Sequence, residues 1–124
     1  MIKTADELVK HGEKAFVVFT RDLHFEYDHN GKGFTGYWVV KSNTIERIDK
    51  VLIYVKNPVN GNNEIYLGRY SHWTDSPEEG RKNIHFTNLE FKGLSNSTWF
   101  EFGGSAWSPT FYIPKVNHWY ENPS

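Results

Sequence analysis

The side chains with the clearest capacity to hold a ligand are a ring and its polar neighbours, Ser71, His72 and Trp73. A Trp surrounded by polar residues favours a binding surface over a place in the core. Such a ring can stack a planar ligand, and polar groups beside it can select among ligands by hydrogen bonding. Lys41 and Ser42 are further polar candidates, because they end a predicted strand that carries other rings. All five are candidate ligand-binding residues.

Trp38, Tyr54 and Trp107 are the other candidate rings. Trp38 and its neighbour Tyr37 lie on one predicted strand, and Tyr54 lies on another. Trp107 lies in a Gly- and Ser-rich loop that can close over a ligand. Aromatic residues make up 17% of the chain, which has no Cys and one Met, so rings must also fill the core. Each ring therefore has a competing packing role, strongest for Trp38, which two valines follow.

The segment from His24 to His29 is the other place with suitable groups for chemistry. If this segment is extended, His24, Glu26 and Asp28 share one face, and such groups can hold a divalent ion or exchange protons. However, none of the six His forms an HxH or HxxxH pair, and the sequence has no GxSxG, P-loop or Rossmann motif. We therefore expect no metal, no cofactor and no catalytic activity.

Length, charge and composition exclude several classes of protein. A chain of 124 residues has room for one domain, residues 1–124. Its formal net charge of -1 lacks the basic excess that a binder of long duplex backbone needs. The absence of Cys removes disulfides and thiolate zinc sites. No run approaches the ~20 apolar residues that span a bilayer, and the first residues are too acidic for a signal peptide. We expect a cytoplasmic protein without membrane contact.

The hydrophobic pattern predicts a mostly β fold of the α+β class. Thr4 and Glu7 fit a capping box for one short N-terminal helix. The run at 50–56 is apolar on both faces, which predicts a central strand, and it is expected to pair antiparallel with 64–70. Gly68 indicates a bulge or a close backbone approach there. Other strands are predicted at 15–20, 36–41, 84–93, 99–102 and 108–113. Six or seven strands with one helix indicate a curved sheet or a barrel.

Four segments between residues 36 and 92 follow one another in a characteristic order: GYWVVKSN, IDKVLIYVK, EIYLGRYSHW and IHFTNLEF. In this order they resemble the PUA-like superfamily, which includes the EVE, ASCH, YTH and SRA domains. Asp49 to Tyr54 is similar to the Gly-Asp–hydrophobic–Tyr strand of EVE and ASCH domains. Val40 to Ser42 is similar to the YTH segment that enters the base pocket. The connection from Ser42 to Lys50 is shorter than the helical segment of EVE and YTH domains, and the ASCH pattern that carries the hydrolytic Lys and Glu is not present.

The resemblance implies a pocket that takes one nucleobase, often a modified one, out of its stack and holds it between aromatic rings. We therefore expect a non-catalytic PUA-like binding module that recognises nucleic acid or a nucleotide through one base. A chain of balanced charge suits a reader of single bases better than a duplex clamp. Two other classes fit the composition. One is a β-sandwich that stacks carbohydrate on exposed rings, and the other is a small phage or mobile-element factor that acts through protein interaction.

Overall fold

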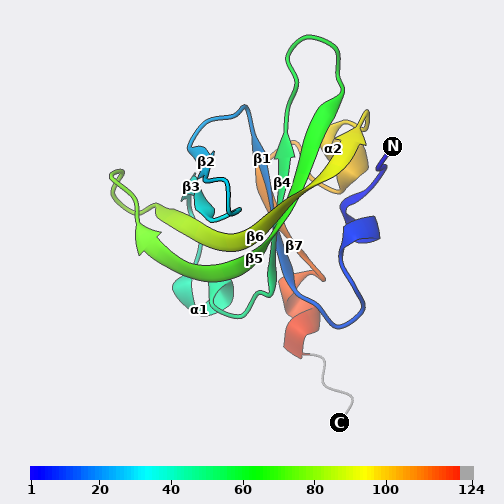
Figure 1. Ribbon diagram of the computed structural model, residues 1–124. Helices are drawn as coiled ribbons and strands as arrows, with labels where there is room; N and C mark the ends of the chain where they lie inside the picture. Colours follow the sequence, from blue (N-terminus) through cyan, green and yellow to red (C-terminus); the bar gives the residue numbers. More distant parts are fainter. Residues whose placement is uncertain (121–124) are drawn as a thin grey trace.

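The two most apolar runs of the chain form two neighbouring interior strands of a seven-stranded mixed sheet in the computed structural model, which describes residues 1–120 (Figure 1). The spatial order is β2-β3-β6-β5-β4-β1-β7. β1 and β4 pair in parallel, and the other neighbours pair antiparallel. The strands are β1 (Ala15–Thr20), β2 (Phe25–Tyr27), β3 (Gly33–Trp38), β4 (Lys50–Val55), β5 (Asn63–Asp75), β6 (Lys82–Ser95) and β7 (Thr110–Ile113).

The helical segments of residues 1–120 are short. They are the 3₁₀ turns η1 (Ala5–Leu8) and η2 (Val116–Tyr120) and the α-helical turns α1 (Ser42–Ile45) and α2 (Trp99–Phe102). The predicted N-terminal capping interaction is present, because the Glu7 carboxylate accepts a hydrogen bond from the Thr4 backbone N–H at 2.7 Å. A short N-terminal helix is therefore confirmed.

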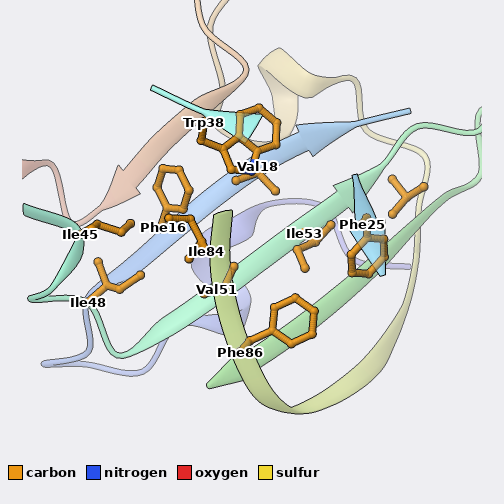
Figure 2. Close-up of a cluster of buried hydrophobic side chains, with 11 residues drawn as sticks. Phe16, Val18, Phe25, Trp38, Ile45, Ile48, Val51, Ile53, Ile84 and Phe86 are labelled. Atoms are coloured by element: carbon orange, nitrogen blue, oxygen red, sulfur yellow. The ribbon is translucent and has the colours of Figure 1, made fainter. Parts of the chain in front are cut away.

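Both faces of β1 and β4 are buried, because these two strands are apolar at nearly every position. The residues alternate between two clusters on the two faces of the sheet. The first core, shown in Figure 2, contains Phe16, Val18, Phe25, Trp38, Ile45, Ile48, Val51, Ile53, Val55, Ile84 and Phe86. The second core contains Ala5, Val17, Leu52, Tyr54, Ile65 and Phe102.

The long strands β5 and β6 bend and curl the sheet around the first core (Figure 1). Three register shifts interrupt their pairing, one of them around Gly68, and such irregularities bend strands. A Cβ at Gly68 would lie 3.0 Å from the Phe86 Cβ, which confirms the close approach expected there. The bend carries β2 and β3 over the first core, so that the Trp38 ring lies near Val18 of β1 (Figure 2). The curl stops short of closure, because β2 and β7 remain the edges of the sheet.

Most of the predicted strand arrangement is confirmed. β4 is an interior strand and pairs antiparallel with β5, as expected, with Val51 opposite Gly68. The segment 84–93 lies within one bent strand, and 15–20 and 110–113 form β1 and β7. Of the two predicted alternatives, the curved sheet is confirmed and the barrel is wrong.

Two local predictions are wrong. Residues 99–102 form α2 instead of a strand, because the Thr98 hydroxyl accepts a hydrogen bond from the Glu101 N–H and the Glu101 carboxylate accepts one from the Thr98 N–H. This reciprocal capping fixes a helical turn. The strand predicted at 36–41 is β3, which begins at Gly33 and ends at Trp38. Within the described residues, no helix is long and apolar enough to cross a membrane.

Candidate ligand-binding site

The structure places two of the predicted site rings in the core, on opposite faces of the sheet. Trp38 is 8% exposed in the first core, and its Nε1 donates to the Thr35 hydroxyl at 3.1 Å. Tyr54 is fully buried in the second core. Its hydroxyl donates to the Ser97 carbonyl at 2.7 Å and accepts from the Asn63 amide at 2.9 Å. The sheet therefore lies between the two rings, and they do not face a common pocket.

Trp73 lies between a core residue and a surface residue. Its half-buried ring packs against the first core, and its Nε1 donates to the Glu46 carboxylate at 3.4 Å. The Lys82 ammonium lies 4.8 Å from the ring centroid. The neighbouring Ser71 and His72 are exposed, and the Ser71 hydroxyl lies 2.9 Å from His72 Nδ1. The protein's own side chains therefore occupy much of the Trp73 surface that the sequence assigns to a ligand.

The remaining predicted residues do not join these rings in one pocket. Lys41 is exposed at the start of α1, and Ser42 is the first, half-buried residue of that turn. Trp107 is 94% exposed in the loop between α2 and β7. Of the eight predicted residues, Trp38 and Lys41 each line a hollow on the open side of the curled sheet. Trp38 lines a hollow between β1 and β3, and Lys41 lines one beside β7.

That open side contains a cleft of about 410 Å³ between β1 and β3, which we call the seam cleft. Ligand sites in proteins have volumes of about 300–1,000 Å³ and are mostly apolar with a few polar groups. The cleft fits this description. It is lined by Phe19, Thr20, Arg21, Leu23, His24, Gly36, Tyr37, Trp38, Glu78 and Arg81. A second hollow of about 300 Å³ lies between the residues after β3, including Lys41, and Tyr112 of β7.

A stacked pair of rings forms part of the cleft wall. The ring centroids of His24 and Tyr37 are 3.7 Å apart, with 17° between the ring planes. The loop that carries His24 is fixed by Thr20, whose hydroxyl bonds both the N–H and the carbonyl of Leu23 at 3.0 Å. His24 itself has a φ of 54°, a left-handed conformation that costs energy in a non-glycine residue and is typical of functional sites. The loop thus holds an imidazole against Tyr37.

Two guanidinium groups lie at the cleft, and they differ in their partners. Arg81 donates from Nη1 to the Tyr37 carbonyl at 3.2 Å, and its Nε lies 3.2 Å from the Glu78 carboxylate. Arg21 lies over the Phe19 ring at 5.3 Å and forms no ion pair within residues 1–120. The Arg21 charge is therefore available to an anionic ligand group.

Gly36 gives the cleft floor its shape. A side chain at this position would overlap the Asn83 amide oxygen. That oxygen is buried and has no hydrogen-bond partner among the described residues. Only glycine lets β3 approach the Asn83 side chain of β6 this closely. A larger residue at position 36 would push the two strands apart and change the shape of the cleft.

Other hollows have less suitable linings. A hollow of about 650 Å³ lies between the N-terminal segment and η2 and contains Trp119. That ring already meets the Tyr112 ring edge-on at 5.3 Å, and its Nε1 donates to the Pro114 carbonyl at 2.7 Å. A hollow of about 640 Å³ around Lys50 and Arg69 is lined mainly by polar groups of both charges. Neither offers a stacked ring pair beside an unpaired guanidinium.

Asp28, which the sequence placed in a candidate metal or acid–base group, has a structural role. The Asp28 carboxylate accepts hydrogen bonds from the N–H groups of Asn30 and Lys32, at 2.9 and 3.0 Å, and closes the turn after β2. These bonds, that from Lys32 above all, lower the pKa of Asp28. Within the described residues, no group of three His, Asp or Glu side chains is arranged to hold a metal.

No sequence pattern indicates Arg21 or Arg81 as a candidate site residue, and the pattern around His24 indicates metal or acid–base chemistry instead of stacking. These residues and Tyr37 come from separate loops and strands that the curl of the sheet brings together. The visible signal was the ring of Tyr37 next to Trp38 on one strand. Comparison of the chain with protein-family models, with curated proteins and with solved structures gives no match.

Proposed function

We propose that this chain is a non-catalytic binding module that recognises a nucleotide, free or at one position of a nucleic acid, through its base in the seam cleft. The observation that carries the proposal is the stacked pair of His24 and Tyr37 beside the unpaired guanidinium of Arg21. An aromatic surface recognises the planar base, and a guanidinium next to it recognises the phosphate. No other hollow described above combines the two.

The chemistry follows from what each group offers. Stacking a base on an aromatic ring contributes about 1–3 kcal/mol and requires only a free π face. A guanidinium can form two parallel charge-assisted hydrogen bonds to phosphate oxygens. The Tyr37 hydroxyl has no partner within residues 1–120 and is available to a polar edge of the base.

Balanced charge limits how much nucleic acid backbone the chain can hold. With a net charge of -1 and one unpaired arginine at the cleft, binding rests on a base and very few phosphates. Each neutralised phosphate changes the logarithm of the affinity by about 0.7–0.9 per logarithm of salt concentration. A shallow salt dependence is therefore expected.

The resemblance to PUA-like domains supports the same class of ligand. The strand that carries this resemblance, β4, pairs with β5 in the hairpin that the Asn- and Gly-rich connection predicts, an arrangement with which the resemblance is compatible. We retain membership of the PUA-like superfamily as part of the proposal. The pocket residues differ from those that the motif suggests, since the proposed rings are His24 and Tyr37.

Titration of the ¹⁵N-labelled protein with three ligand sets tests the proposal. The sets are nucleoside 5′-monophosphates, the corresponding nucleosides, and short neutral oligosaccharides. We expect monophosphates to shift the amide resonances of 20–24 and 36–38, with nucleosides binding more weakly. Tight binding of an oligosaccharide, or shifts confined to other parts of the sheet, would contradict the proposal and favour the carbohydrate alternative.

A further inference from the structure

A second aromatic surface lies where β2, β5 and β6 meet, away from the residues of the seam cleft. Tyr66 is flanked by Tyr27 and Phe91, with ring centroids 5.8 and 5.4 Å away and interplanar angles of 45° and 56°. The buried ring of Phe25 lies 5.3 Å from Tyr66 at the base. Tyr27 is 50% exposed and Phe91 is 55% exposed. We call these rings, with Glu64, the aromatic patch.

A carboxylate is fixed at this patch. The Tyr66 hydroxyl donates to the Glu64 carboxylate at 2.8 Å. Burial, and then this hydrogen bond, raise the pKa of Tyr66, so the phenol stays protonated and keeps donating at neutral pH. Glu64 forms no ion pair with any cation of the described residues. The patch therefore presents π faces and one negative charge without a positive partner.

Elsewhere the protein covers aromatic faces with its own cations. Lys82 lies over Trp73 and Arg21 lies over Phe19, at 4.8 and 5.3 Å from the ring centroids. In the part of the chain that the structure describes, no Lys or Arg is found over a ring of the patch. The cation position of the patch is thus left open to a ligand.

We propose that the aromatic patch binds a methylated ammonium group, of the quaternary type. The face of an aromatic ring attracts a cation, and cages of such rings recognise quaternary ammonium ligands. Methyl groups make the cation weakly hydrated, so its apolar surface can pack on Tyr27, Tyr66 and Phe91 while Glu64 neutralises its charge. An unmethylated ammonium is strongly hydrated and offers nothing for these rings to bury.

A pair of probes of the same shape tests the proposal. Choline carries a trimethylammonium group, and 3,3-dimethylbutan-1-ol carries a neutral tert-butyl group in its place. We expect choline to shift the ring proton resonances of Tyr27, Tyr66 and Phe91 in NMR titrations and to bind about tenfold more tightly than the neutral alcohol, the ratio expected for a partly desolvated cation–π contact. Equal binding of the two probes, or no shift with either, would overturn it.

Variants separate the contributions of charge and ring. Glu64→Gln should weaken choline binding about fivefold while the shape of the patch is retained, and Phe91→Ala, an exposed position, should weaken it similarly. Glu90→Gln is the matched control, because Glu90 is an exposed carboxylate on β6 already paired with Lys92 at 3.7 Å. If Glu64→Gln and Glu90→Gln have equal effects, Glu64 is not the counter-ion and the proposal is wrong.

Two further measurements identify the source of the ammonium group and exclude a different occupant. A peptide with trimethyllysine that binds more tightly than choline would place the ammonium group on a protein partner and support the site. Sedimentation equilibrium would show whether the patch instead joins two copies of this chain, and a dimer that Phe91→Ala dissociates would overturn the proposal. Arg21→Ala should leave choline binding unchanged. The proposal for the aromatic patch can therefore be refuted without refuting nucleotide binding in the seam cleft, and the reverse is also true.

Discussion

Tyr54 and Tyr37 lie on two strands of one curled sheet, and the protein surrounds them in opposite ways. Tyr54 is fully buried, and its hydroxyl both donates and accepts a hydrogen bond. Tyr37 is half-buried in an open cleft and stacks on one imidazole. Exposure and unsatisfied bonding capacity, more than ring type, therefore distinguish the proposed binding ring Tyr37 from the packing ring Tyr54.

The groups around Tyr54 and those around Tyr37 differ in the same way. Around Tyr54, the rings of Phe102 and Trp99 pack at 5.1 and 5.5 Å, and the Asn63 amide also donates to the Ser95 carbonyl at 3.1 Å. This network uses up its own donors and acceptors, as buried polar groups must. At the seam cleft, Arg21 retains an unpaired charge. Substitutions in the two regions should therefore affect different quantities.

The largest effect is expected from Tyr54→Ala. Removing this buried ring should lower the free energy of unfolding by about 3–5 kcal/mol, because a cavity remains in the second core. Tyr54→Phe keeps the ring and should cost about 1–3 kcal/mol, since the Ser97 carbonyl loses its shortest donor and the Asn63 amide loses one of its acceptors. Urea unfolding measures both. A folded Tyr54→Phe protein that loses nucleotide affinity would break the contrast and place Tyr54 in the site.

Tyr37→Ala should have the reverse profile. We expect nucleotide binding to weaken by about 1–3 kcal/mol, the contribution of one stacked ring, with the free energy of unfolding changed by less than about 1 kcal/mol. Tyr37→Phe retains the ring and loses only the hydroxyl, so it should weaken nucleotide binding less than Tyr37→Ala does. Calorimetric titration together with urea unfolding measures the two quantities on the same samples. Loss of stability without loss of affinity would make Tyr37 a packing residue like Tyr54.

The burial of Trp73 is intermediate between that of the buried Tyr54 and that expected of a ligand-binding ring. Its ring is half-buried, bonded to Glu46 and covered by Lys82. We therefore expect Trp73→Ala to lower the free energy of unfolding by about 1–2 kcal/mol through lost apolar burial and to leave nucleotide affinity unchanged. An affinity loss at constant stability would restore the sequence-based assignment of Trp73 to the ligand.

The smallest effect concerns pH and lies in neither region. His72 and His85 stack at 4.3 Å where β5 and β6 bend. Burial, and then the neighbouring His72, lower the pKa of His85. The folded protein then binds this proton less readily than the unfolded chain, so the contribution to stability is complete above the ordinary His pKa of about 6.5 and is lost as pH falls below it.

Urea unfolding between pH 5 and 8 measures this dependence. His85→Gln should flatten the decline of stability toward acid pH, whereas His29→Gln, at an exposed position in the turn after β2, should retain it. Equal pH profiles for wild type and His85→Gln would show that another group is responsible.

The fold was largely predictable because its strongest signals are local. The continuous apolar run at 51–55 and the Asn- and Gly-rich connection after it determine an interior strand and an antiparallel neighbour. The turn at 99–102 was missed because its aromatic residues resemble a strand, although Thr98 and Glu101 repeat the capping pattern of Thr4 and Glu7.

The site was less predictable because it is assembled by curvature. Trp38 is a core residue that also lines the cleft, whereas Arg21 and Arg81 are 60 residues apart and reach the same cleft through the curl of the sheet. Polar neighbours in sequence made Trp73 look exposed. Alternation along a strand places the adjacent His72 and Thr74 on the other face, so these two carry no information about the burial of the ring itself.

The central claim, that Arg21 beside a ring pair recognises the phosphate of a base-stacked nucleotide, is tested most directly by an affinity ratio. Calorimetry of a nucleoside 5′-monophosphate and its nucleoside gives this ratio for wild type, Arg21→Ala and Arg69→Ala, where Arg69 is an exposed arginine on β5 outside the cleft. We predict that the ratio falls by about tenfold or more in Arg21→Ala, as expected for a charged hydrogen bond, and is unchanged in Arg69→Ala. A ratio that Arg21→Ala leaves unchanged would contradict the account.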